Sequence, residues 1–236
     1  MEDYLGQALA QAAALIARAA GEPIPRRCRI RGDCCASPAA FALAARRQTD
    51  PEGLAAALAG RIELTGSWFD RGAAEKGYVN LHLSPQWYAA VAGAVIEPGP
   101  TVDTPVPPVP AFPAAIDLGD WRFLCRSGGG DSVPAPILAA RQDDGNSAWR
   151  VRYTARRMGE LAARRGTLPP ANWSLSDRRL LQRAAEYPSR RRERGPDLGR
   201  YLAELAGLLW KCPGASGAVQ GTCARVLTAG YGQMTG

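Results

Sequence analysis

The sequence predicts an α+β domain followed by an all-α helical bundle. Apolar residues recur at helical spacing between capping signals in both halves of the 236-residue chain. Short runs with strand character, at residues 29–31, 61–64 and 78–83, occur in the first half. Residues 97–113 separate the halves with seven prolines, which favour a stiff, extended linker over a helix or a central strand.

The helices expected in the first half are bounded by proline, glycine or capping residues. Leu5, Leu9 and Ile16 share one helical face, and Gly21 with Pro23 ends that run. Three more helices begin with a cap followed by proline, and we place them at residues 38–47, 51–60 and 85–96. Together with the three strands they form an α+β module of about a hundred residues.

The second half predicts four helices that form a bundle, at residues 146–165, 176–187, 196–211 and 216–229. Before them, residues 114–145 show no clear pattern. The segment RSGGGDS at 126–132 lacks the Lys-Ser/Thr of a phosphate loop, so we expect a flexible turn there. The acidic residues of this insert, Asp117 and Asp120 among them, are expected to be solvated.

The composition is that of a soluble protein, which we expect to be cytoplasmic. No apolar run approaches the length that crosses a bilayer, and the N-terminus MEDYLGQALAQ is acidic and amphipathic, unlike a signal peptide. The six cysteines include no CxxC pair and His82 is the one histidine. We therefore expect reduced, mostly buried thiols, with no metal site and no cofactor.

The positive charge is concentrated in one part of the second half. Residues 150–200 hold fourteen arginines against five acidic residues, a net charge of +9, while residues 1–100 are neutral. Such a block attracts polyanions, nucleic-acid phosphates first among them. A solvated arginine-rich helical face gives the same count, and charge alone does not separate the two.

Several motifs of the first half resemble one family. GYVNLHLSPQW, at 77–87, is similar to the GFINFFLSP signature near the end of the N-terminal additional domain of arginyl-tRNA synthetases. Arg31-Gly32-Asp33 followed by SPAAFALA, and DPEGLAAALAGRI from Asp50, resemble two earlier motifs of the same domain. The resemblance implies that residues 1–96 form this α+β domain.

The second half resembles a later part of the same enzymes. NSAWRVRYTARRMGEL, from Asn146, is similar to the NPAFYVQYAHARI stretch where their anticodon-binding domain of the DALR type begins. LSDRRLLQRAAEYPS and DLGRYLAELAGLLWK resemble the next two helices, and TCARVLTAGYGQMTG resembles a shortened form of the last. Residues 142–236 are thus expected to be a DALR-like bundle whose last helix and tail are compressed.

Between these halves the chain departs from the family. Residues 97–141 stand where a class I synthetase carries its catalytic domain. A HIGH-type motif needs two histidines, and neither a KMSK-like sequence nor a dinucleotide-binding glycine fingerprint occurs. We therefore expect no catalytic residues and no enzyme activity.

The resemblance also implies which residues contact tRNA. Tyr78 and Asn80 fall on the aromatic and amide positions that face the D-arm corner; a ring stacks on an unpaired base and an amide reads its edge. In the second half, Tyr153 and Arg157 fall on the Tyr and Arg of the family motif, which lies beside the anticodon arm. The chain departs from that motif at Arg152, where the family has Gln, and at Ala155, where it has His. The arginines there and in the later run suggest phosphate contacts instead: Arg152, Arg156, Arg164, Arg165 and Arg191. His82 is expected to pack inside the small domain. Trp149 and Trp173 are expected to pack in the bundle, with base stacking as the alternative.

These implications favour a non-catalytic tRNA-binding protein, with an arginine acceptor as the expected tRNA. It would bind the D-arm elbow and the anticodon arm of the tRNA. Its codon-family selectivity would be relaxed, because the tail that lies near the anticodon is short. It would present the tRNA to a modifying enzyme or protect it. The alternatives are a protein-interaction module, or a subunit of a split or regulated arginyl-tRNA synthetase. No membrane partner is expected.

Overall fold

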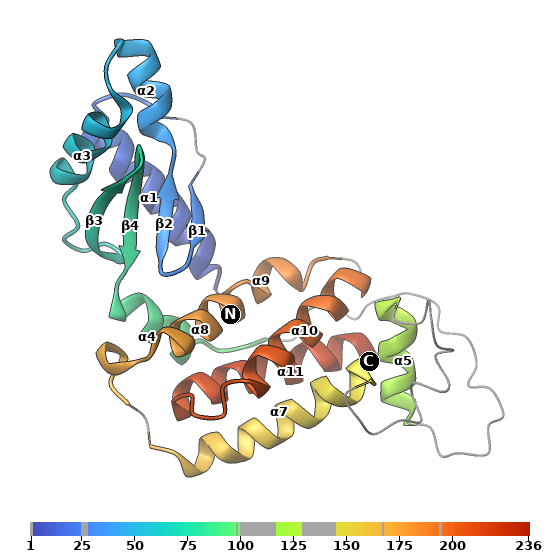
Figure 1. The fold of residues 1–236 in the computed structure, drawn as a ribbon. Helices are drawn as coiled ribbons and strands as arrows, with labels where there is room; N and C mark the ends of the chain where they lie inside the picture. Colours follow the sequence, from blue (N-terminus) through green and yellow to red (C-terminus); the bar gives the residue numbers. More distant parts are fainter. Residues whose placement is uncertain are drawn as a thin grey trace. The chain divides into compact units, whose positions relative to one another are not determined.

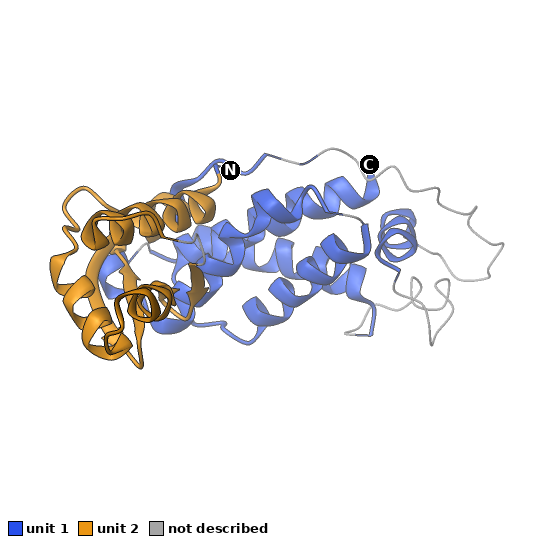
Figure 2. Cartoon of the chain, turned by 90° about the horizontal axis from the view of Figure 1, so that it is seen from above, with its two compact units in different colours: residues 1–2, 92–236 blue, residues 3–91 orange. Residues whose placement is uncertain are grey.

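The computed structural model describes residues 2–24, 28–97, 99, 117–128, 145–166, 168–193 and 195–236. The chain divides into two compact units: residues 3–91, and residues 92–236 together with residues 1–2 (Figure 2). The first holds a small antiparallel sheet with helices, and the described part of the second is helical (Figure 1). This agrees with the predicted order of an α+β part followed by a helical part.

The first unit is a four-stranded antiparallel sheet with helices packed on it. Its sheet has the strand order β1-β2-β4-β3, so β4 lies between β2 and β3. The elements in chain order are α1 (Tyr4–Ala20), β1 (Arg29–Arg31), β2 (Cys34–Ser37), α2 (Ala39–Arg47), α3 (Pro51–Arg61), β3 (Phe69–Glu75), β4 (Tyr78–Leu83) and α4 (Pro85–Gly93).

Local signals explain where the first helices begin and end. The Asp3 carboxylate accepts the N–H of Gly6 at 2.8 Å, and Gly21 ends α1 with a left-handed φ of 71°. The Asp50 carboxylate accepts the N–H of Gly53 at 2.5 Å, and Pro51 occupies the first turn of α3. The helix positions predicted from these caps are confirmed.

The alternation of β4 separates a buried face from an outer face of the sheet. Val79, Leu81 and Leu83 are at most 2 % exposed, and α1, α2 and α3 pack against the strands. Tyr78, Asn80 and His82 alternate with them and are half-buried. The strand predicted at 78–83 is confirmed, and its polar residues share the outer face.

Other strands differ from the predictions. Residues 61–64 are not a strand: Arg61 ends α3 and residues 62–64 connect it to a turn. The polar segment 65–77, for which no strand was predicted, contains β3, a largely exposed strand at the edge of the sheet. β2 was missed as well, because it is only four residues long.

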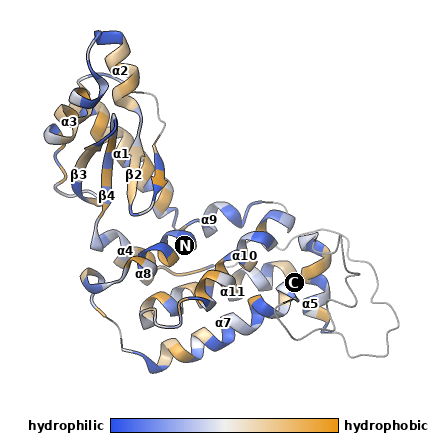
Figure 3. Cartoon of the chain, in the orientation of Figure 1, coloured by the Kyte–Doolittle hydropathy of each residue, from blue (hydrophilic) through white to orange (hydrophobic). Residues whose placement is uncertain are grey.

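The described helices of the second unit form a bundle. Its elements are α5 (Leu118–Ser127), α7 (Ser147–Arg164), η1 (Pro170–Asn172), α8 (Leu175–Ala185), α9 (Tyr187–Arg190), α10 (Gly195–Trp210) and α11 (Gly217–Thr235). α11 packs against α5, α7, α8 and α10, and α10 also packs against α5 and α7. Hydrophobic and hydrophilic residues alternate along α7, as expected of a helix with one buried face (Figure 3).

Two caps position the ends of α7 and α8. The fully buried Asn146 accepts the N–H of Trp149 at 3.0 Å and begins α7. Ser174 and Asp177 form a capping box at the start of α8. Asp177 also accepts the N–H of Ser216 at 2.8 Å, so one carboxylate joins the starts of α8 and α11.

The second unit also corrects parts of the sequence analysis. α5 lies inside the stretch that showed no pattern; Arg126 and Ser127 belong to it, and Gly128 ends it with φ 65°. Pro188 does not end the helical region, since α9 contains it. α11 runs to Thr235 instead of residue 229, so the last helix is not compressed to the extent predicted.

Two predicted segments fall largely outside the described residues. They are the proline-rich linker, of which residues 98 and 100–113 are not described, and residues 129–132 of the RSGGGDS turn. Among the helices that are described, none combines the length and the apolar composition of a membrane span.

Candidate nucleic-acid interface

The outer face of the sheet gathers basic, aromatic and amide side chains. Pairing places Arg31 beside Cys34 and then His82, Arg29 beside Ala36 and then Asn80, and Arg71 beside His82, so these residues point to one side. The three arginines are exposed. We call this set the sheet surface: Arg29, Arg31, Arg71, Tyr78, Asn80 and His82.

Tyr78 is held between an aromatic ring and an arginine. The ring of Phe41 meets it edge to face at 5.3 Å between centroids, and the guanidinium of Arg31 lies 5.4 Å from its ring centroid. Phe41 is itself 41 % exposed and rests on Gly77, where a Cβ would come within 2.5 Å of its ring. The glycine of this hairpin therefore lets Phe41 support Tyr78.

Asn80 stands between two alanines. Ala36 and Ala73 are its cross-strand neighbours, and its side-chain amide has no hydrogen-bond partner among the described residues. Because both neighbours are short, neither of them covers the amide. It has its donor and acceptor available to an outside partner.

His82 lies on the same outer face and not in the hydrophobic core. Its Nδ1 is 3.5 Å from the Asp33 carboxylate, and the guanidinium of Arg71 is 3.2 Å from both ring nitrogens. The expectation that it packs inside the domain is therefore wrong. Its contact with Arg71 holds the exposed guanidinium of that residue beside the centre of the sheet surface.

A second surface runs along the outward side of α7. Residues spaced by three, four, seven and eight positions share one side of a helix, and the members of this stripe are exposed or half-buried. We call it the helix surface; it consists of Trp149, Tyr153, Arg156, Arg157, Glu160 and Arg164. Its length is about 22 Å at 1.5 Å per residue.

Arg152 of α7 forms an ion pair with a residue of the protein itself, Asp120. Its guanidinium donates to both carboxylate oxygens of Asp120, at 3.1 and 3.2 Å, and Tyr231 donates its hydroxyl to the same carboxylate at 2.7 Å. Asp120 is 1 % exposed, so it is not the solvated acid that the sequence predicted. One carboxylate thus joins α5, α7 and α11.

The contacts among Asp120, Arg152 and Tyr231, which we call the Asp120 cluster, also shift the pKa values of two of these residues. The hydrogen bond to Asp120 raises the pKa of Arg152, and burial together with the Asp120 hydrogen bond raises the pKa of Tyr231. Both groups therefore stay protonated, and the cluster keeps its pairing at neutral pH.

Three further arginines from the predicted contact set also have protein partners. Arg165 donates to the backbone oxygens of Pro213 and Ala215, at 2.5 and 3.1 Å. Arg156 pairs with Glu160 one turn on, at 3.1 Å, and remains 83 % exposed. Arg191 reaches only the backbone oxygen of Glu97, at 3.5 Å. Arg165 thus stabilises a loop, whereas Arg156 and Arg191 keep much of their donor capacity.

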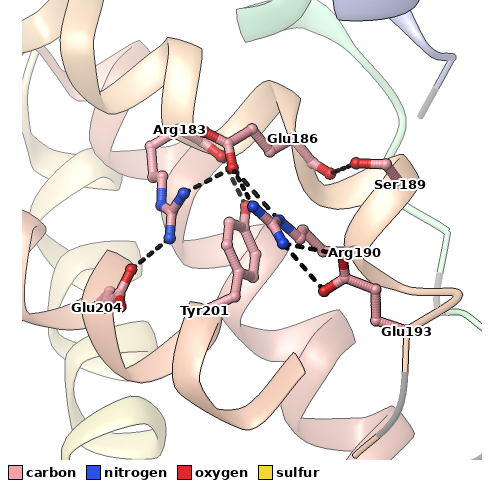
Figure 4. Close-up of polar contacts among 7 residues, drawn as sticks. All are labelled: Arg183, Glu186, Ser189, Arg190, Glu193, Tyr201 and Glu204. Atoms are coloured by element: carbon pink, nitrogen blue, oxygen red, sulfur yellow. Dashed lines mark hydrogen bonds and ion pairs between the residues drawn. The ribbon is translucent and has the colours of Figure 1, made fainter. Parts of the chain in front are cut away.

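The arginines of α8 and α9 form a network with acidic residues (Figure 4). Arg183 bridges Glu186, at 2.6 Å, and Glu204, while Arg190 donates to Glu193 at 2.8 Å and also contacts Glu186. These pairs neutralise part of the basic block, including Arg190 of the run at 190–192, whose neighbour Arg194 lies outside the described residues.

Two arginines of the helix surface keep their charge unpaired. Arg157 and Arg164 are exposed, and neither has an ion-pair or hydrogen-bond partner within the described parts of the chain. Tyr153 is 40 % exposed and stacks on Trp149, with 4.7 Å between centroids. The structure therefore brings Tyr153, Arg157 and Arg164 together on one outward face, as the family motif implied for Tyr153 and Arg157.

Several residues at these surfaces had not been singled out from the sequence. Arg29, Arg31, Arg71 and Phe41 belong to or support the sheet surface, Glu160 lies on the helix surface, and Trp210 of α10 lies 5.9 Å from Tyr153. Strand alternation from Asn80 would have found Arg29 and Arg31 only once the pairing of β1, β2 and β4 was known. Trp210 had no sequence signal, since a helix-end tryptophan is usually buried.

The described side chains give little sign of metal or thiol chemistry. No group of three or more His, Cys, Asp or Glu side chains in the described ranges is placed to hold a metal ion. Burial raises the pKa of the Cys28, Cys34, Cys35 and Cys125 thiols, and that of Cys223 to about 12, which disfavours the reactive thiolate. A cavity of about 700 Å³ between α7 and α11 is lined mainly by alanine and glycine, with Arg225 and Thr228 as its polar residues.

Comparison with known proteins adds no assignment. No family model, curated protein or solved structure matches the chain. The sheet surface and the helix surface remain as the candidate sites. Each combines aromatic rings with exposed cations, and the sheet surface adds an amide; rings, cations and amides are the groups that bind bases and phosphates in nucleic-acid interfaces.

Proposed function

We propose that this chain is a non-catalytic tRNA-binding protein, built from an α+β domain of the arginyl-tRNA synthetase additional type and a DALR-type bundle. The first unit binds the D-arm corner of a tRNA and the second binds its anticodon arm. The sequence motifs favour an arginine acceptor as the tRNA. The bound tRNA is presented to a modifying enzyme or a synthetase, or is protected from nucleases.

The observation that carries this proposal is the pairing of Tyr78 and Asn80 on the outer face of the sheet. They are the two positions that the family motif assigns to tRNA, and the hydrophobic partners of the strand lie on the opposite face. An amide without a partner among the described residues, next to a ring supported by Phe41, suits an unpaired base that stacks and is read at its edge. Arg29, Arg31 and Arg71 add positive charge for the phosphates around that base, and they outnumber the exposed carboxylate beside Tyr78, that of Glu75.

The helix surface supports the same proposal for the second unit. Tyr153, Arg157 and Arg164 face outward together, and they lie on the motif that resembles the start of the DALR domain. The ion pairs of Arg152 and Arg190 reduce the number of free cations, so fewer phosphate contacts are expected than the net charge of the segment implies. Binding should therefore be moderate and dependent on salt.

The absence of the synthetase chemistry follows from the sequence. His82 is the one histidine, so the chain has no HIGH-type motif, and it has no KMSK-like sequence. Adenylate formation requires groups that hold the phosphates of ATP, and the motifs that supply them are not there. The proposed role is consequently to bind tRNA and not to aminoacylate it.

The test is a filter-binding titration of the full chain against total tRNA, at about 50 and about 200 mM salt, with the bound fraction sequenced. We expect arginine acceptors to be enriched, and Tyr78→Ala and Asn80→Ala each to weaken binding about 10-fold. Gln86→Ala is the matched control, because it removes an exposed amide from the same unit without touching the sheet surface. It should change the affinity by less than about 2-fold.

Two results would contradict the proposal. No retention of tRNA at the lower salt concentration would remove the RNA function and favour a protein partner. Equal binding by the wild type, Tyr78→Ala and Asn80→Ala would show that the sheet surface is not the tRNA site. Circular dichroism of each variant checks that the unit still folds.

A further inference from the structure

Three aromatic side chains lie together at the helix surface, and two of them are stacked. Trp149, which is half-buried, and Tyr153 are nearly parallel, with 11° between their planes and 4.7 Å between centroids, and Trp210 of α10 lies 5.9 Å from Tyr153, tilted by 55°. Tyr153 is 40 % exposed and Trp210 is 46 % exposed. We call Trp149, Tyr153 and Trp210 the aromatic ladder.

The ladder differs from two buried tryptophans of the chain, Trp87 and Trp173, whereas Trp68 is half-buried like Trp149. Trp87 and Trp173 are at most 5 % exposed, and each donates its indole N–H to a backbone oxygen, at 3.1 and 3.0 Å. The indole N–H groups of Trp149 and Trp210 have no such partner among the described residues. Leaving a large ring in water forfeits the free energy of its burial, so a partly exposed cluster of this size indicates a surface that something covers.

The charges beside the ladder favour a polyanion as the partner. Arg157 follows Tyr153 by one helical turn and Arg164 lies further along the same stripe, and both are unpaired within the described residues. Lys211 follows Trp210 directly, is exposed, and has no side-chain partner there either. Rings interleaved with free cations are the pattern of surfaces that bind single-stranded nucleic acid.

The composition of the stripe also bears on specificity. Base edges are read by amides, and by arginines that are held in a fixed position. The helix surface contains no Asn, Gln or His, and its arginines Arg157 and Arg164 have no partner among the described residues that would fix their guanidinium groups. Its acidic member, Glu160, is engaged by Arg156. Rings accept every base, since each base has a flat face, and free arginines and lysines bind phosphates whatever the sequence.

We infer that the aromatic ladder binds unpaired nucleotides of an RNA loop by stacking, without discriminating between bases. This inference rests on the proposed function and sharpens it. The second unit holds the single-stranded loop of the tRNA, while base discrimination belongs to Asn80 of the sheet surface. The chain therefore accepts tRNAs with different anticodon loops, provided that they satisfy the sheet surface.

The experiment measures binding of the full chain to fluorescently labelled oligonucleotides of about seven nucleotides, and to a whole tRNA, by anisotropy. We expect the affinities for oligo(A), oligo(C) and oligo(U) to agree within about 5-fold. Trp210→Leu and Tyr153→Leu should weaken binding of every RNA about 10-fold, whereas Trp210→Phe, which keeps a ring, should stay within about 3-fold of the wild type.

Leu208→Ala is the matched control, because Leu208 lies on the same helix and is also 46 % exposed but has no ring. It should leave the affinities unchanged. An equal loss for Leu208→Ala and Trp210→Leu would overturn the inference, as would wild-type binding of tRNA by Trp210→Leu. A sequence preference above about 30-fold among the oligonucleotides would overturn the lack of discrimination.

The failures of the two proposals are distinguishable. If the tRNA binds, Tyr78→Ala weakens it and the ladder variants do not, this inference fails and the proposed function stands. If neither tRNA nor any oligonucleotide binds at about 50 mM salt, both fail.

Discussion

The sheet surface and α7 use their arginines in different ways. On the sheet, Arg31 and Arg71 rest on the rings of Tyr78 and His82 and remain exposed. On α7, Arg152 forms an ion pair with the buried carboxylate of Asp120, whereas Arg157, five residues further along, has no partner among the described residues. The difference teaches that the partner of an arginine, and not its place in a basic run, decides whether it is available to a phosphate.

The largest expected effect comes from Arg152→Ala. It leaves the Asp120 carboxylate, 1 % exposed, with Tyr231 and Asn146 but without its cationic partner. Because the Arg152 side chain is itself 43 % exposed, the cost should be about 2 to 3 kcal/mol, less than for a fully buried pair. Urea unfolding of the full chain should show this loss. Binding of tRNA, measured at a temperature where the variant is folded, should change by less than about 2-fold.

Arg157→Ala is the converse variant. Because Arg157 is exposed and unpaired in the described structure, its removal should change the free energy of unfolding by less than about 0.5 kcal/mol. It should weaken tRNA binding and reduce the dependence on salt by about one phosphate contact. Two results would contradict the assignment of Arg152 to stability and Arg157 to binding. One is an equal loss of tRNA affinity for Arg152→Ala and Arg157→Ala, and the other is an unchanged free energy of unfolding for Arg152→Ala.

This comparison also shows what could be predicted from the sequence. Both Arg152 and Arg157 were expected to contact tRNA, Arg157 by its place in the family motif and Arg152 by its charge beside that motif. The fate of Arg152 depends on Asp120, which is 32 residues away in a stretch that showed no clear pattern. A contact at that separation has no local signal.

The missed elements have similar causes. α5 has an N-cap at Asp117 and apolar residues at Trp121 and Leu124, but proline and glycine on both sides obscured its ten residues. β3 reads as polar because it is an edge strand, largely exposed on both faces. In contrast, β4 and most of the long helices were predictable, since their alternation, period and caps are strong over many residues.

A glycine pair tests the support beneath the sheet surface, with a smaller expected effect. Gly77 has a φ of 77°, and a Cβ there would come within 2.5 Å of the Phe41 ring; Gly66 has a φ of 72°, and a Cβ there would meet nothing within 4 Å. Gly66→Ala should therefore lower the free energy of unfolding by about 1 kcal/mol, through backbone strain alone. Gly77→Ala adds the displacement of Phe41, for a total of about 2 kcal/mol.

The two glycine variants also separate stability from binding. Because Phe41 supports Tyr78, Gly77→Ala should weaken tRNA binding several-fold, and Gly66→Ala should not. Urea unfolding and filter binding of both variants give the four numbers needed. Equal stability losses would show that the close contact between Phe41 and Gly77 relaxes freely, and that the hairpin does not fix the position of Tyr78.

The smallest effect extends the comparison to the thiols beneath the two surfaces, Cys35 in the sheet and Cys223 in the bundle. Both are fully buried, and burial raises the pKa of Cys223 from an ordinary value near 9 to about 12 and that of Cys35 as well. Between pH 9 and pH 12 each thiol stays protonated in the folded chain but loses its proton in the unfolded chain. The contribution of the thiol to the free energy of unfolding is therefore fully present below pH 9 and decreases as the pH rises toward 12. For each thiol the loss is at most about 1.4 kcal/mol per pH unit. Urea unfolding at pH 8 and pH 10 should give a smaller decline for Cys35→Ala and for Cys223→Ala than for the wild type, and parallel declines would show that neither thiol stays protonated in the folded chain.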